Sequence, residues 1–320
     1  MKKLLSLLIL ALLLLTACGK KPEKDALTKI KERDMLIVGV KEDAKPFGFI
    51  SKTTGKVEGF DIDVARYIAK EIIGEERKVK FVPVTSATRM EAVTSGEVDM
   101  VIATMSITPQ RQYLIDFSEP YYIAGQTAVV REDSKIHTFS DLKKKTTIVV
   151  LGSTPEQNLR RIAPTAKLVG YKSYKEAFDA FLAGKGDALS TDDTIISGFM
   201  MDNKGYRVLK HRISQEPYAI GIRQYEDKKL KNTLDVIVVR MKKDGTIKRL
   251  EQKWHLNRPA FDKKSPEQDK KQPEIDKNQA NVEKEQAEVM EKLPEVPDKQ
   301  PDIDTKQLNV EEKQVEVQKI

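Results

Sequence analysis

The hydrophobic pattern of residues 35–258 predicts alternating strands and helices. Residues 36–40 are a short apolar run, which is typical of a buried parallel strand. Residues 59–73 repeat apolar side chains every three or four positions, which predicts an amphipathic helix that Gly74 ends. Shorter runs predict further strands at 79–84, 100–105 and 127–131, and a short helix at 88–94.

The same alternation starts again after residue 146. We expect strands at 147–151, 166–171, 188–190 and 218–223, and helices at 154–162, 173–182, 194–201, 230–242 and 246–253. Strands that alternate with helices favour parallel βαβ layers. Two such series predict two α/β lobes, and ligands of open α/β sheets bind beyond the carboxyl ends of the strands. The polar residues at those ends are therefore the candidates for function.

The first 18 residues have the layout of an export signal. A basic start is followed by residues 4–15, which are apolar except for Ser6 and too few to span a bilayer, since about 20 residues are needed. Leu15-Thr16-Ala17-Cys18 comes next and contains the single cysteine of the chain. This stretch resembles a bacterial lipobox, which implies cleavage before Cys18 and a lipid on its sulfur. An ordinary signal peptide with a chance cysteine is the alternative.

Composition separates the C-terminal 62 residues from the rest of the chain. Residues 259–320 contain 11 lysines, 16 acidic residues and one aromatic residue. Their net charge is −5, whereas the whole chain has a net charge of +7. Such a polar segment has too few apolar groups to offset its ordering entropy, so we expect a disordered charged tail. The range 18–34 is expected to be a lipidated tether, and residues 1–17 the signal peptide.

Several kinds of protein are excluded by composition. One cysteine rules out a disulfide framework and a Cys-rich zinc site, and His137, His211 and His255 lack metal-ligand spacing. We therefore expect no metal site and no cofactor. The lysines are dispersed and the export signal removes the chain from nucleic acid, so we expect no nucleic-acid partner. The basic charge instead suits proximity to an anionic membrane or cell wall.

Arg111 is the first candidate site residue. It follows the predicted strand 100–105, where Thr108 and Pro109 are suited to start a helix. A cation in a first helical turn opposes the helix dipole by about 0.3–1 kcal/mol, so its presence there suggests a bound carboxylate. The alternative is a surface arginine paired with Asp116 or Glu119.

Two further strand ends offer polar groups. Thr154 is expected to cap the helix after Gly152, with Gln157 completing a capping box. Asp193 is expected to cap the helix after the strand 188–190, which would leave Asp192 free to bind an ammonium group. The alternative for Thr154 is that it only starts a helix. The alternative for Asp192 and Asp193 is that both are solvated loop carboxylates.

Four segments together resemble the polar amino-acid-binding lipoproteins of solute-binding protein family 3, which serve ABC importers. The resemblance covers about residues 35–255 and is carried by Gly59-Phe60-Asp61-Ile62-Asp63-Val64-Ala65, by residues 99–104, by Ser106-Ile107-Thr108-Pro109 with Arg111, and by Asp116-Phe117-Ser118-Glu119-Pro120-Tyr121-Tyr122. It implies an α/β, two-lobe periplasmic-binding-protein fold of type II, in which each lobe is a sheet flanked by helices. Lobe 1 would be 35–124 and 217–258, and lobe 2 would be 125–216, with hinge crossings near 122–127 and 214–218.

The resemblance also implies how the two ends of an amino acid are held. Arg111 would bind the α-carboxylate bidentately, and Asp192 would bind the α-ammonium group. Thr104 and Ser106 would add contacts from lobe 1 and Thr154 from lobe 2. Tyr218, at the second crossing, is a further ligand-binding candidate.

The ligand side chain would meet a basic region. Lys41 and Lys45 follow the first strand, and Ser86 and Arg89 lie in a loop similar to that of aspartate- and glutamate-binding members. We therefore expect glutamate or aspartate as the first ligand and glutamine as the second. A helix-surface position is the alternative for Arg89.

The resemblance implies a monomeric, lipid-anchored protein outside the cytoplasm that delivers its ligand to an ABC permease and, through it, to the ATPase. We expect no enzyme, because no nucleophile–base pair is evident. The alternatives are an exported enzyme of the same fold, such as a dehydratase, and a cell-surface interaction protein that uses the tail.

Overall fold

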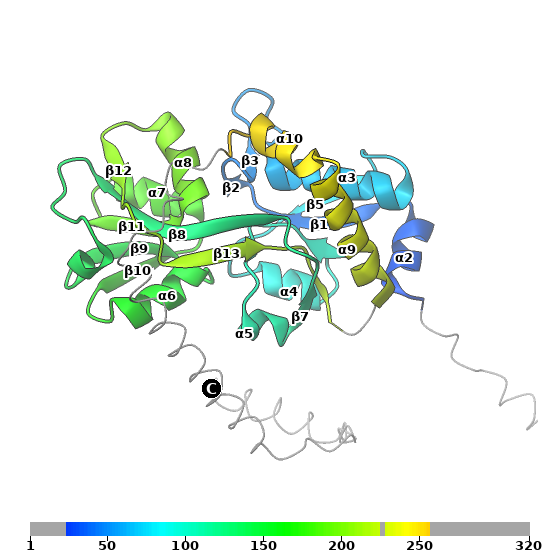
Figure 1. The fold of residues 1–320 in the computed structure, drawn as a ribbon, viewed down its shortest axis with the longest axis horizontal. Coiled ribbons are helices and arrows are strands. Elements are labelled where there is room, and N and C mark those ends of the chain that lie inside the picture. Colours follow the sequence, from blue (N-terminus) through cyan, green and yellow to red (C-terminus); the bar gives the residue numbers. More distant parts are fainter. Residues whose placement is uncertain (1–23, 225–227, 257–320) are drawn as a thin grey trace, which may run out of the picture. The chain divides into compact units, whose positions relative to one another are not determined.

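Figure 1 shows the fold of residues 24–224 and 228–256, which are the residues that the computed structural model describes. The export signal, Cys18 and the tail 259–320 lie outside these residues, so what the sequence indicates for them stays a prediction. No helix within the described ranges combines the length and the apolar character that crossing a bilayer requires.

The first sheet has five strands in the order β5-β1-β6-β14-β7. Strand β1 is parallel to its two neighbours β5 and β6, while β14 is antiparallel to β6 and β7. Strand β14 follows all strands of the second sheet in the sequence, so the chain passes from the first sheet to the second and back to the first. The strands are β1 (Leu36–Val40), β5 (Val79–Pro83), β6 (Met100–Val101), β7 (Ile115–Phe117) and β14 (Gly221–Arg223).

Six helices belong with the first sheet. Their bounds are α2 (Ala26–Arg33), α3 (Phe60–Ile73), α4 (Arg89–Thr94), α5 (Pro109–Gln112), α9 (Lys228–Lys243) and α10 (Thr246–Lys253). Helix α3 packs on β1 and β5, and α9 packs on α3 and α2. A small antiparallel sheet lies beside α3 and consists of β2 (Asp43–Ala44), β3 (Gly48–Ile50) and β4 (Val57–Glu58).

The second sheet has the order β10-β9-β11-β8-β12, and β13 pairs with β8 as well. Strands β9, β10 and β11 are parallel, whereas β8 is antiparallel to β11, β12 and β13. The strands are β8 (Tyr122–Arg131), β9 (Thr146–Val150), β10 (Lys167–Tyr171), β11 (Ala188–Asp192), β12 (Tyr206–Val208) and β13 (Ser214–Tyr218). The helices are α6 (Thr154–Ile162), α7 (Tyr174–Leu182), α8 (Asp193–Asp202) and the short 3-10 helix η1 (Phe139–Leu142).

Strands β8 and β13 connect the two sheets, and Figure 1 shows them running side by side. Their register pairs Tyr122 with Tyr218 at one end and Gln126 with Ser214 at the other. Phe47 packs edge-on against both Tyr122 and Tyr218, with ring centroids 5.3 Å apart in each case. The positions of these two strands are thus fixed by hydrogen bonds along their length and by aromatic packing at one end.

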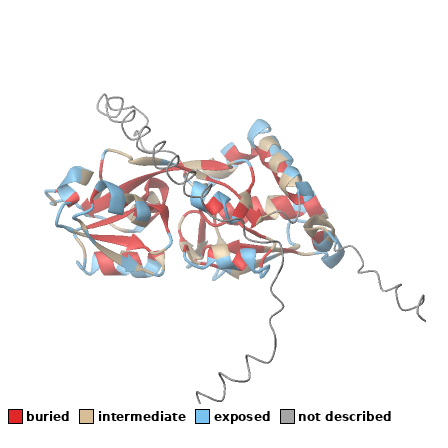
Figure 2. Cartoon of the chain, turned by 90° about the horizontal axis from the view of Figure 1, so that it is seen from below, coloured by how far each residue is buried: buried red, intermediate tan, exposed pale blue. Residues whose placement is uncertain are grey.

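Apolar side chains are buried where the sequence periodicity places them, and Figure 2 shows many buried residues in the strands, while the helices carry both buried and exposed residues. On β1, Leu36, Val38 and Val40 are fully buried. On α3, Val64 and Ile68 are among the fully buried side chains. Burial of this kind stabilises the fold by about 25 cal/mol per Å² of apolar surface.

Most of the expected elements are confirmed, three of them with their bounds unchanged, at 36–40, 154–162 and 246–253. The strand expected at 100–105 was wrong in length, because it ends at Val101. Beyond it the carbonyl groups of Ala103 and Thr104 accept from a side chain, Arg89, instead of joining a strand ladder. The strand expected at 218–223 was also wrong, because it is divided between β13 and β14. The lobe boundaries given above stay a prediction.

The tether expected at 18–34 is corrected by helix α2. Asp25 caps this helix, since its carboxylate accepts from the N–H group of Thr28 at 2.8 Å. Ile30 is fully buried and belongs to the main apolar core. The charged residues around it hid the helix in the sequence, because a helix of eight residues contributes one fully buried side chain only.

Ile30→Ala tests whether α2 is part of the folded body. The change should lower the free energy of unfolding by about 2–4 kcal/mol, because it removes a fully buried side chain and leaves a cavity. Chemical denaturation measures this difference, with Lys31→Ala, an exposed position on the same helix, as the control. Equal stability of the two variants would show that α2 is not packed on the core.

Candidate functional site

Six charged side chains lie buried near one another where the two sheets meet. Three are cations and three are acids, and none is more than 9% exposed. Burying a charge is unfavourable unless it is paired or hydrogen-bonded, so each of these groups needs a partner. The six residues are Lys41, Asp61, Arg89, Arg111, Asp192 and Glu216.

Arg111 lies in α5, and the start of this helix is as expected. Thr108 is the N-cap, its hydroxyl accepts from the N–H group of Arg111 at 3.2 Å, and Pro109 is the first helical residue. The guanidinium donates from Nη1 to the carbonyl of Ser106 at 2.7 Å and from Nη2 to that of Gly152 at 3.1 Å. Burial, aided by repulsion from Arg89, lowers the pKa of Arg111 to about 9. The guanidinium is thus a buried cation held only by neutral carbonyl groups.

Asp192 ends β11 and is buried, with 4% of its surface exposed. Oδ2 accepts from the hydroxyl of Tyr218. Oδ1 is buried and has no hydrogen-bond partner among the described residues. Burial, with repulsion from Glu216 as the next cause, raises the pKa of Asp192 to about 8. A group that donates to Oδ1, above all a cation, would stabilise the ionised carboxylate.

Thr104 is held in a left-handed backbone conformation, with φ of 49°, by two buried charges. Its N–H group donates to Oδ2 of Asp61 at 2.9 Å, and its carbonyl accepts from Nη1 of Arg89 at 2.9 Å. Tyr121 donates to the other oxygen of Asp61 at 2.9 Å. The hydroxyl of Thr104 and Nε of Arg89 are buried without a partner among the described residues. Arg89 is therefore buried, not on the helix surface, and it supports the backbone next to the site.

Lys41 is fully buried at the end of the first strand. Its ammonium group donates to the hydroxyl of Ser86 at 2.8 Å and lies 4.7 Å from the centre of the Tyr174 ring. Burial lowers the pKa of Lys41 to about 7, and repulsion from Arg89 and Arg111 acts in the same direction. The structure thus brings Lys41, Ser86 and Arg89 to one region, as the sequence predicts.

Lys45 is not brought into this buried group, although the sequence predicts that it meets the ligand. Its ammonium group pairs with the carboxylate of Asp202 at 3.1 Å, and its side chain is 35% exposed. Asp202 ends α8, so this ion pair joins the small sheet to the second sheet's helices. The charge of Lys45 is already compensated by solvent and by the Asp202 carboxylate, so it does not require a ligand anion.

Thr154 is corrected in its structural role. Ser153, not Thr154, is in the N-cap position of α6, and no capping-box hydrogen bond forms. The Thr154 hydroxyl instead donates to Oε2 of Glu216 at 2.9 Å. Thr154 is therefore the first residue of α6, and its hydroxyl is directed to the charged group, at 7% exposure of the residue.

Glu216, like Asp61, belongs to the buried group although it was not predicted from the sequence as a site residue. It is 3% exposed, and its carboxylate accepts from the hydroxyl groups of Thr154 at 2.9 Å and Ser214 at 2.6 Å. Alternate residues of a strand share one face, so Ser214, Glu216 and Tyr218 lie on the same side of β13. This alternation of polar groups before Tyr218 is the signal that could have found Glu216.

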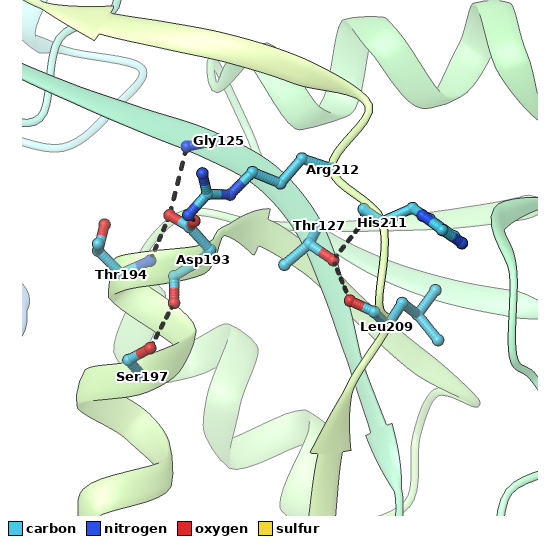
Figure 3. Close-up of polar contacts among 8 residues, drawn as sticks. All are labelled: Gly125, Thr127, Asp193, Thr194, Ser197, Leu209, His211 and Arg212. Carbon is cyan, nitrogen blue, oxygen red and sulfur yellow. Dashed lines mark hydrogen bonds and ion pairs between the residues drawn. The ribbon is translucent and has the colours of Figure 1, made fainter. Parts of the chain in front are cut away.

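Both carboxylate oxygens of Asp193 have partners, unlike those of its neighbour Asp192, and Figure 3 shows the contacts of Asp193. Its carboxylate pairs with Arg212 and accepts from the N–H groups of Gly125 and Thr194 at 3.3 and 2.7 Å. The helix-cap role expected for Asp193 is corrected, since it is the first residue of α8 and Asp192 is in the cap position. Asp193 ties α8 to β8 and to the segment before β13, which leaves Asp192 as the available carboxylate.

Gly125 is required for this contact. A Cβ atom there would lie 2.3 Å from Cδ of Arg212, so any side chain would displace the arginine that pairs with Asp193.

Within the described residues, no three His, Cys, Asp or Glu side chains are grouped so that they could hold a metal ion. The described site consists of charged side chains and hydroxyl groups.

The chain is similar to several bacterial amino-acid-binding proteins. The chain is 39% identical over 273 residues to the ABC transporter glutamine-binding protein GlnH of Bacillus subtilis (strain 168), which covers 81% of this chain and 100% of the relative. It is 32% identical to the glutamate-binding protein GluB of Corynebacterium efficiens, over 75% of this chain and 85% of that protein. A crystal structure of the cysteine-binding protein from Campylobacter jejuni matches with a TM-score of 0.70 and 31% identity, over 72% of this chain and 93% of the other.

These relatives confirm the type II periplasmic-binding-protein fold that the sequence predicts, and all three are named as binding proteins. The family model of the bacterial extracellular solute-binding proteins, family 3, matches residues 36–257, which include every charged side chain of the buried group. With that match and these relatives, the chain belongs to the bacterial extracellular solute-binding proteins of family 3.

Proposed function

We propose that this protein captures a polar amino acid and delivers it to an ABC permease. The observation that carries the proposal is the pair Arg111 and Asp192, a buried cation held by neutral carbonyls and a buried carboxylate with one unpartnered oxygen. The α-carboxylate and α-ammonium groups of an amino acid would supply the two missing charges. Charge-assisted hydrogen bonds of this kind are about twice as strong as neutral ones.

Each end of the amino acid is assigned its own contacts. The α-carboxylate would bind Arg111, with Ser106 beside it, and the α-ammonium group would bind Oδ1 of Asp192. The unpartnered hydroxyl of Thr104 supports its place in the first-sheet half of the site. Tyr218 acts through Asp192, since its hydroxyl already donates to that carboxylate.

The ligand side chain would extend toward Lys41, Ser86 and Arg89. Two buried cations favour a carboxylate, so glutamate or aspartate is the first proposed ligand. Glutamine is the second, and the name of the Bacillus subtilis relative supports an amide ligand as well. Both glutamate and glutamine place an oxygen at the same distance from the α-carbon, so one site can accept either.

Capture would occur by closure of the lobes predicted at 35–124 with 217–258 and at 125–216. The hydrogen bond from Arg111 to the Gly152 carbonyl, at 3.1 Å, joins an element of the first sheet to the loop before α6. The paired strands β8 and β13 would serve as the hinge, because they alone of the described strands link the two sheets.

Membership of the family implies a location outside the cytoplasm. We propose further that a lipid on Cys18 anchors the monomeric protein to the membrane, next to the permease and its ATPase. The ligand would be released unchanged, so an incubated amino acid should be recovered intact by mass spectrometry. A dehydrated product would favour the alternative of an exported enzyme.

Arg111→Ala should remove most of the affinity for the amino acid. The loss is expected to be about 2–5 kcal/mol, because the α-carboxylate would stay buried without its bidentate partner. Isothermal titration calorimetry with glutamate and glutamine measures it. Arg161→Ala, an exposed arginine on α6, is the control. Unchanged binding by a folded Arg111 variant would exclude the assigned role.

Lys41→Met tests the side-chain half of the site. Loss of this buried cation should weaken glutamate binding at least tenfold more than glutamine binding, because only glutamate carries a second carboxylate. Lys45→Met is the matched control, since it removes the same group from a position that the structure places outside the buried cluster. Equal weakening of both ligands in Lys41→Met would place the side chain elsewhere. Arg89 is less suitable for this test because it also holds the backbone of Thr104.

A further inference from the structure

The net charge of the buried group differs from the net charge of the predicted ligand-binding residues alone. Lys41, Arg89 and Arg111 against Asp192 would leave an excess of positive charge, which favours a dicarboxylic ligand. Asp61 and Glu216 are also buried in the same region, and Asp193 is neutralised by its ion pair with Arg212. Three acids therefore face three cations before any ligand binds. A dicarboxylic amino acid would then bring an extra negative charge, and an amide would not.

Asp61 and Glu216 differ in how their charges are used. Asp61 accepts from the N–H group of Thr104 and from Tyr121, so it supports the first-sheet half of the site. Glu216 accepts from two neutral hydroxyl groups, and its carboxylate forms no ion pair with any described residue. Its negative charge is therefore not cancelled locally and acts on the rest of the site.

Two effects support an action of Glu216 on the proposed ligand contacts. Its charge repels that of Asp192 and raises the pKa of that carboxylate, and it attracts the guanidinium of Arg111 and raises its pKa. Tyr218, two residues along the same face of β13, donates to Asp192. Glu216 thus lies among the groups assigned to both ends of the amino acid.

Glu216 also fixes the direction of the Thr154 hydroxyl. Because the carboxylate can only accept, the hydroxyl proton of Thr154 points at Oε2, at an oxygen–oxygen distance of 2.9 Å. The Thr154 oxygen then presents lone pairs to its other neighbours. It can accept from an ammonium group but cannot donate to a carboxylate.

We propose that Glu216 is a specificity-determining residue, whose negative charge opposes the binding of a second ligand carboxylate and thereby favours glutamine relative to glutamate. This rests on the proposed function of the same site. Lys41 and Arg89 attract the ligand's side-chain carboxylate, and Glu216 limits that attraction. The ratio of glutamate to glutamine affinity is set by the difference between this attraction and the repulsion from Glu216.

The test is a calorimetric titration of the full chain in detergent, near neutral pH, with L-glutamate and with L-glutamine. Glu216→Gln keeps the shape and removes the charge, so it should raise the ratio of glutamate to glutamine affinity by roughly tenfold or more. Ser214→Ala is the matched control, because it removes one hydrogen bond to Glu216 and leaves the charge, and it should keep the ratio within about threefold.

Glu216→Met is a second neutral variant, so the inference stays testable where one of them fails to fold, as judged by thermal unfolding. A ratio that stays within about threefold of wild type in a folded neutral variant would overturn the inference and leave the proposed function intact. A wild-type protein that binds neither amino acid would overturn the proposed function, and the inference with it.

Discussion

The structure depends on a carboxylate, that of Asp192, which is buried with one of its oxygens unpartnered among the described residues. An uncompensated buried charge is destabilising, and it persists only where the surrounding fold holds it in place or where a partner arrives. Arg111 presents the complementary case of a cation held by carbonyl groups alone. Together they form a site whose missing interactions match the two charged ends of an amino acid.

Groups that touch no ligand hold this arrangement in place. Asp193, with Arg212 and Gly125, binds α8 to the strands that connect the sheets, and so fixes Asp192 one residue earlier (Figure 3). Phe47 packs on the aromatic rings at the other end of those strands. The two connecting strands are thus held in place near both ends.

Local patterns explain why much of this fold could be predicted from sequence. Apolar runs and helical periodicity identify β1 and α3, and Thr108 with Pro109 identifies the start of α5, since each depends on a few neighbouring residues. Long-range contacts explain the failures. Thr154 leaves the helix cap because Glu216, 62 residues away, accepts its hydroxyl, and the strand at Met100 stops where Arg89 takes two carbonyl groups. Glu216 was missed because the alternation of polar residues before Tyr218 does not by itself show that the glutamate is buried.

The most direct test of the account is thermal unfolding of the wild-type protein with each of the 20 common amino acids in turn. A ligand that binds only the folded state stabilises it by about 2.7 kcal/mol at a hundred times its Kd, which raises the unfolding temperature by several degrees. The account predicts such a rise for glutamate or aspartate and for glutamine, and none for leucine or valine, which lack a polar side-chain oxygen. Stabilisation by no amino acid, or by apolar ones alone, would contradict it.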